Sequence, residues 1–95
     1  MISSDQIFSK KKRLPWRIID NEVVIVDLAG NNVLQLNDVG RCIWEQINGE
    51  RPITEIAKTV SAEYEVDPSK ADSDTLQFIS SLAEKDLVYA EHSTD

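Results

Sequence analysis

The chain has 95 residues, of which 41% are hydrophobic and 28% charged, and its formal net charge is −7. This length suits one domain, and this composition excludes a disordered, collagen-like or disulfide-rich chain. The single cysteine, Cys42, and the single histidine, His92, exclude an internal disulfide and a His/Cys metal cluster. Apolar runs fall well short of the roughly 20 residues of a membrane helix, and the first residues lack a signal-peptide pattern, so we expect a cytoplasmic protein.

The charge is distributed unevenly. Residues 1–15 hold four basic side chains against one acidic side chain, whereas residues 16–95 hold 6 basic and 16 acidic ones. We therefore expect a flexible basic N-terminal arm over residues 1–15, a domain over residues 16–90 and a C-terminal tail over residues 91–95. A domain this acidic repels phosphate backbones, so we do not expect a nucleic acid or a membrane surface as partner.

The first part of the domain has the pattern of β-strands. Residues 16–19, 23–26 and 33–36 are short runs of β-branched and apolar residues, each bounded by turn residues. The links at residues 20–21 and 29–32 are rich in Asn, Asp and Gly, which favour hairpin turns. The pattern predicts a three-stranded antiparallel meander.

From Asn37 onward the apolar residues repeat with helical spacing. Asn37 suits the N-cap of a helix that ends before residues 48–49. Pro52 suits the start of a second helix ending near Tyr64. Asp67 and Pro68 form a cap followed by a first-turn proline, and they predict a third helix to about Lys85. A short apolar run over residues 87–90 indicates a final strand.

These elements predict an α+β fold similar to a winged helix-turn-helix, with a three-stranded antiparallel sheet followed by three helices. In such a fold the third helix would enter a DNA groove. Residues 67–86 hold five acidic side chains against two basic ones, however, so the architecture is expected without the DNA function.

The predicted third helix is apolar over an unusually wide arc of roughly 160°. We expect one part of this arc to contact the core and another to contact a groove or the sheet; ordinary packing on the sheet is the alternative. The residues on the arc are Ala71, Thr75, Leu76, Phe78, Ile79, Leu82 and Ala83.

The sequence shows no recognisable set of catalytic residues. A nucleophilic triad needs a histidine held in the core, and the three glycines are not spaced as in a phosphate-binding loop. Cys42 lies on the apolar side of the first helix, where we expect a buried and unreactive thiol. The sequence therefore predicts a binding module with no catalytic residue, metal or cofactor.

The ordered set of motifs over residues 16–90 resembles the PqqD family. That family includes peptide chaperones of pyrroloquinoline quinone (PQQ) synthesis and recognition elements for ribosomally made, modified peptides such as lasso peptides. The residues that carry the resemblance are Leu36-Asn37-Asp38-Val39-Gly40-Arg41-Cys42-Ile43-Trp44-Glu45, Asn48-Gly49-Glu50-Arg51, Ile56-Ala57, Tyr64-Glu65-Val66-Asp67 and Phe78-Ile79-Ser80-Ser81-Leu82. Two departures are Lys85-Asp86, where relatives often have a glycine, and Pro52, where a Thr cap is frequent.

The resemblance implies that the leader segment of a precursor peptide binds as an extra strand on the third strand, beside the third helix. It also implies that the bound peptide is presented to a modifying enzyme, a radical S-adenosylmethionine (SAM) enzyme or a leader peptidase. The expected peptide-binding residues are Val33, Leu34, Gln35, Leu36, Asp74, Thr75, Phe78, Ile79 and Leu82. Strand alternation directs Leu34 and Leu36 to the core.

Three functions remain open at this point. The first is a non-catalytic peptide chaperone, which needs an open strand edge. The second is a winged-helix DNA-binding regulator, and the third is a structural subunit of an enzyme complex. For each expected peptide-binding residue, ordinary sheet packing is the alternative role.

Overall fold

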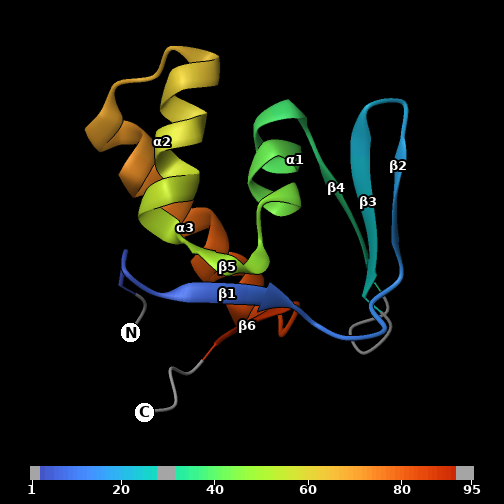
Figure 1. The fold of residues 1–95 in the computed structure, drawn as a ribbon. Coiled ribbons are helices and arrows are strands. Elements are labelled where there is room, and N and C mark those ends of the chain that lie inside the picture. Colours follow the sequence, from blue (N-terminus) through green and yellow to red (C-terminus); the bar gives the residue numbers. More distant parts are fainter. Residues whose placement is uncertain (1–2, 28–31, 92–95) are drawn as a thin grey trace.

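The computed structural model describes residues 3–27 and 32–91, and within them it contains six strands and three helices (Figure 1). In chain order these are β1 (Ile7–Lys10), β2 (Trp16–Ile19), β3 (Glu22–Asp27), β4 (Asn32–Leu36), α1 (Asp38–Glu45), β5 (Asn48–Pro52), α2 (Ile53–Tyr64), α3 (Pro68–Glu84) and β6 (Val88–Ala90). The predicted α+β class and all three predicted helices are confirmed.

Strands β2, β3 and β4 form the antiparallel meander that the sequence predicts, here called the meander sheet. Asp20 and Asn21, which connect β2 to β3, have φ values of 51° and 68°. Positive φ at both residues matches the twist of a two-residue hairpin, and Asn and Asp tolerate it better than other side chains do. The predicted second hairpin falls on residues 29–32, of which 29–31 lie outside the described residues.

A second antiparallel sheet, with strand order β5-β1-β6, crosses the base of the molecule; we call it the frame sheet (Figure 1). Its central strand is Ile7–Lys10, and Phe8 is only 3% exposed. The expectation of a flexible arm is therefore wrong for these four residues. The strand partners of Ile7 and Phe8 are Pro52 and Ala90, which lie far away in the sequence, so the local pattern of residues 1–15 does not indicate a strand.

The helix ends follow the predicted caps. The Asn37 side chain accepts a hydrogen bond from the Gly40 amide at 3.1 Å, and the Asp67 side chain accepts one from the Ser69 amide at 3.2 Å. Pro52 is the N-cap residue of α2, and its side chain makes no capping hydrogen bond. Past the end of α3, Asp86 has φ of 62°, so it adopts the conformation that a glycine takes at many helix ends.

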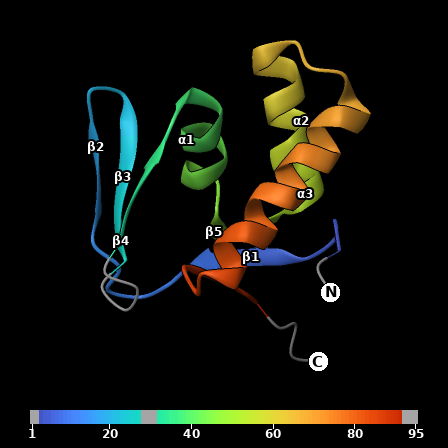
Figure 2. The same ribbon diagram turned by 180° about the vertical axis from the view of Figure 1, so that it is seen from behind.

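The core lies where α1 stands between the meander sheet and the α2–α3 pair (Figures 1 and 2). Trp44 of α1 is fully buried, and so are Val23 and Ile25 of β3. The Lys10 ammonium links the two sheets: it donates to the Ile47 carbonyl at 2.8 Å and lies 5.5 Å and 5.2 Å from the ring centroids of Trp16 and Trp44. Burial lowers the pKa of Lys10, and the nearby Glu45 carboxylate partly offsets that shift.

Candidate functional site

The backbone of β4 lies at one edge of the meander sheet, and hydrogen-bond alternation determines which of its amides face outward. The Val26 amide donates to the Pro15 carbonyl at 2.9 Å, so the backbone groups of Val26 point toward the β2 side. Because successive residues of an antiparallel strand alternate in this respect, Val23 and Ile25 point toward β4.

The partners of Val23 and Ile25 on β4 are Leu36 and Leu34. These two leucines therefore bond to β3, and the amide and carbonyl groups of Val33 and Gln35 point to the open edge. An outward row of this kind is a template for an added strand.

The side chains of β4 alternate as predicted. Leu36 is buried and Leu34 is half-buried against the core, whereas Val33 is 64% exposed and Gln35 is exposed. The Leu34/Leu36 face therefore belongs to the core side, and the prediction of the two strand faces is confirmed.

A cleft of about 540 Å³ lies next to this edge, between β4, the start of α1 and one face of α3. The two elements β4 and α3 can be followed on this side of the molecule in Figure 2. The apolar lining comes mainly from Leu36, Val39, Ile43 and Phe78, and carboxylates are contributed by Glu22 and Asp74. Asn37, Gln35 and Gly40 complete the lining.

Gly40 sets how closely α1 and α3 approach each other at this cleft. A Cβ at position 40 would lie 3.1 Å from the Leu36 Cβ and 3.3 Å from the Phe78 Cζ. Both distances are shorter than ordinary carbon contacts, so a larger residue would displace the Phe78 ring. The position of Phe78 in the cleft thus depends on the absence of a side chain at Gly40.

The structure brings only some of the predicted site residues together. Gln35, Leu36, Asp74 and Phe78 line the cleft, and Val33 and Leu34 lie on the adjoining strand. Three predicted residues, Thr75, Ile79 and Leu82, are at most 2% exposed and belong to the core instead.

The wide apolar arc of α3 makes two kinds of contact, as predicted. Its larger part enters the core, and Phe78, which is partly buried, lines the cleft. Helical spacing alone did not separate the two parts, because only the packing of α3 on α2 decides which side is inward.

Sequence reasoning missed the cleft residues Glu22, Asn37, Val39, Gly40 and Ile43. The signal that would have found most of them is the direct succession of β4 by the capped helix α1. Because only Asn37 separates β4 from α1, the first turn of α1 stays close to the end of that strand.

Cys42 lies away from this cleft, in a polar hollow between α1 and α2, and it is half-buried rather than buried as predicted. Its Sγ donates to Glu63 Oε2 at 3.4 Å. Partial burial, followed by the Glu63 carboxylate, raises the pKa of Cys42 to about 11. The thiol stays protonated at neutral pH and is a poor nucleophile, in agreement with the unreactive thiol that we predicted.

Residues 3–27 and 32–91 contain neither a metal-binding cluster nor a membrane-spanning helix. No group of three or more His, Cys, Asp or Glu side chains is arranged to hold a metal ion. No helix in this part of the chain is both long and apolar enough to span a bilayer.

A small sheet with an open edge beside a partly apolar helix-lined cleft is the architecture of a domain that takes up an extended peptide as an additional strand. The sequence profile of the family described as coenzyme PQQ synthesis protein D (PqqD) matches residues 22–88. The chain belongs to the PqqD family.

Individual relatives agree with this assignment. The PqqA binding protein of Xanthomonas campestris pv. campestris (strain 8004) is 28% identical over 61 residues, which cover 64% of this chain and 66% of that protein. The structure of TbiB1 in complex with the TbiA(beta) leader peptide is 30% identical, with a TM-score of 0.75 over 92% of this chain and 99% of that one. The PqqD truncation of Methylobacterium extorquens PqqCD, at 19% identity, shares the fold with a TM-score of 0.76 over 94% of this chain and 95% of that one.

Proposed function

We propose that this protein is a non-catalytic chaperone that captures the leader segment of a ribosomally made precursor peptide as a fourth strand on β4. The observation that carries the proposal is the outward row of Val33 and Gln35 backbone groups beside the β4–α3 cleft. The PqqA binding proteins and the leader complex of TbiB1 support it, because these relatives bind precursor peptides.

Strand addition explains how such a site combines affinity with selectivity. Main-chain hydrogen bonds to Val33 and Gln35 contribute binding that depends little on the leader sequence. Alternate leader side chains face the cleft, where Leu36, Val39 and Phe78 favour apolar residues. This function uses no nucleophile, metal or cofactor.

The bound leader would be presented to a modifying enzyme. We propose that this enzyme is a radical SAM enzyme, if the precursor belongs to a PQQ-like pathway, or a leader peptidase, if it belongs to a lasso-peptide pathway. The step would take place in the cytoplasm, where the precursor is synthesised.

The proposal is tested by titrating the isotope-labelled full chain with two synthetic probes, the TbiA(beta) leader peptide and PqqA. Amide shifts should concentrate in residues 32–36 and in the cleft-lining residues of α1 and α3. Lack of binding to both probes at millimolar concentration, or shifts confined to α2 and the frame sheet, would contradict the proposal.

A matched pair of variants isolates the backbone contribution. Val33→Pro removes an outward amide donor, whereas Val33→Ala keeps the donor and removes most of the same exposed side chain. We expect Val33→Pro to weaken leader binding by about tenfold or more, which corresponds to roughly 1.4 kcal/mol. Val33→Ala should stay within about threefold of the parent protein, and equal losses in the two variants would argue against strand addition.

A further inference from the structure

The meander sheet has a second face that α1 does not cover. Val23 and Ile25 point toward α1 and are fully buried. Val24 and Val26 alternate with them along β3, so their side chains lie on the opposite face. Ile19 and Val33, on the neighbouring strands, lie on that face too and are 48% and 64% exposed.

The centre of this outer face is apolar and slightly hollow, while Glu22 and Gln35, the strand partners of Ile19 and Val24, add polar groups to the same face. Its hollow of about 360 Å³ is lined by Pro15, Trp16, Arg17, Ile19, Val24 and Val26. Contiguous exposed apolar side chains framed by polar ones mark interaction surfaces more often than isolated ones do.

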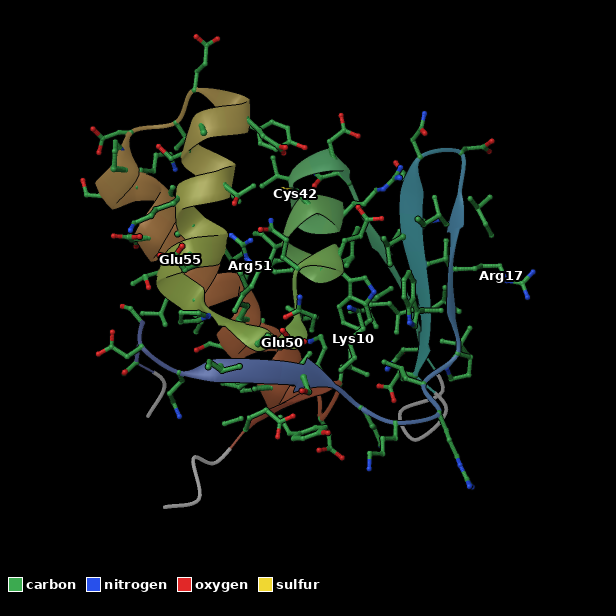
Figure 3. The ribbon with its side chains drawn as sticks, in the orientation of Figure 1. Lys10, Arg17, Cys42, Glu50, Arg51 and Glu55 are labelled. Carbon is green, nitrogen blue, oxygen red and sulfur yellow. The ribbon has the colours of Figure 1, made fainter. Side chains whose placement is uncertain are left out.

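Basic side chains border the same face. Lys11, Lys12 and Arg13 line a smaller hollow together with Val26 and Asp27, and Arg17 projects away from the body of the molecule (Figure 3). Lys11 also forms an ion pair with Asp86 at 3.4 Å. Residues 10–17 carry five basic side chains and no acidic one, whereas the rest of the chain carries 17 acidic and 5 basic ones, so the basic charge of the chain is concentrated at this border. An acidic partner surface is attracted here and repelled elsewhere on the chain.

We propose that the outer face of the meander sheet, formed by Ile19, Val24, Val26 and Val33 with the basic border of residues 11–13 and Arg17, docks the modifying enzyme. The matching surface on that enzyme has an apolar centre and a rim of Asp and Glu side chains. This inference rests on the proposed function and extends it from the peptide to the protein that receives it.

Continuity with the peptide edge supports this occupant. The backbone of Val33 points to the open edge, while its side chain lies on the outer face. An enzyme seated on this face would therefore lie beside the bound leader. A second copy of the chain fits less well, because face-to-face pairing would bring two basic borders together, and the acidic body would oppose an anionic membrane.

The test uses the full chain and, as purified partners, each of the two proposed kinds of modifying enzyme, a radical SAM enzyme and a leader peptidase, with binding measured by biolayer interferometry. Arg17→Glu reverses a border charge and Ile19→Lys interrupts the apolar patch. The matched controls are Lys58→Glu on α2 and Tyr89→Lys on β6, which make the same kinds of change at exposed positions of other elements. Circular dichroism establishes that each variant is folded.

We expect Arg17→Glu and Ile19→Lys each to weaken enzyme binding by at least tenfold and the controls by less than twofold. Enzyme binding of the parent chain should also fall as salt is raised, whereas leader affinity should stay within twofold of the parent in all four variants. Unchanged enzyme binding in both test variants, or equal losses in the controls, would overturn the inference.

Two other outcomes would also overturn it. The first is a dimer of the parent chain, seen by sedimentation, that Ile19→Lys dissociates without changing enzyme binding; this result would assign the face to a second copy. The second is binding of the parent chain to phosphatidylglycerol vesicles. If Arg17→Glu abolishes this binding and leaves enzyme binding unchanged, the outer face belongs to a membrane contact. A failure of the proposed function is separate, since it appears as a parent chain that does not bind the leader at all.

Discussion

The two small sheets of this protein differ in how the chain builds them. The meander sheet uses three strands that follow one another in the sequence, and its strand β4 is left at an edge. The frame sheet joins β1, near the start, to β5 in the middle and β6 near the end. Long-range pairing of this kind requires the whole domain to be folded, whereas a hairpin needs only local turns.

Burial follows the same division. Phe8 of the frame sheet is 3% exposed, whereas all four residues of β2 in the meander sheet are exposed. The frame sheet therefore mainly holds the domain together. In the meander sheet β3 also joins the core through Val23 and Ile25, and it is the outer strands β2 and β4 that offer surfaces for binding. The following predictions test this division, beginning with the largest expected effect.

Phe8→Ala should cost about 3–5 kcal/mol of unfolding free energy, because it removes a buried aromatic ring from the frame sheet. Val33→Ala, at an exposed position of the meander sheet, should cost about 0.5 kcal/mol or less. Urea denaturation followed by circular dichroism measures both. Similar losses in the two variants would remove the basis for dividing the sheets by role.

Two glycines allow a sharper comparison. In the frame sheet, Gly49 has φ of 81°, and an added Cβ would lie 2.6 Å from the Ser9 Oγ, so Gly49→Ala should lower stability by about 1–3 kcal/mol. In the cleft, Gly40→Ala should change stability by about 1 kcal/mol or less, because the gain in helix propensity offsets the crowding.

Leader binding should rank these two variants in the opposite order. Gly40→Ala displaces the Phe78 ring, so we expect the affinity to fall about three- to tenfold. Gly49→Ala should leave the affinity of the folded protein unchanged. Calorimetric titration with the leader probe that binds the parent chain measures both, and a larger affinity loss in Gly49→Ala would show that the cleft assignment is wrong.

Lys10→Met tests the link between the sheets. The variant keeps the length of the side chain but loses the hydrogen bond to the Ile47 carbonyl and the contact of the cation with two indole rings. We expect a loss of about 1 kcal/mol, since the cost of burying the ammonium offsets part of these interactions. Adding Trp16→Leu to both backgrounds gives a double-mutant cycle, and strictly additive effects would exclude direct coupling.

Cys42 reports on the α1–α2 contact, away from both sheet edges, and there we expect the leader to have no effect. Because its pKa is raised from 9.0 to about 11, the thiolate fraction at pH 8 is roughly a hundredfold lower in the folded chain than in the unfolded chain. Iodoacetamide should therefore react about a hundredfold more slowly with the native protein, and the rate should rise with pH until about 11. Saturating leader should leave this rate unchanged; fast alkylation at pH 8 would contradict the pKa.

Much of the fold follows from the sequence by itself. Asp20-Asn21 determined a tight hairpin, Asn37 and Asp67 with Pro68 determined two helix starts, and the alternation in β4 determined which of its faces is buried. Each of these features depends on residues within a few positions of one another, so local stereochemistry and periodicity are sufficient.

Only the tertiary structure decided the remaining features. Ile7–Lys10 is a strand because β5 and β6 supply partners from distant parts of the chain, and Thr75, Ile79 and Leu82 are core residues because α3 packs on α2. The cleft likewise exists only where Gly40 lets Phe78 approach α1. In each case the stabilising free energy comes from contacts between residues far apart in the sequence. A local sequence pattern contains no information about such contacts.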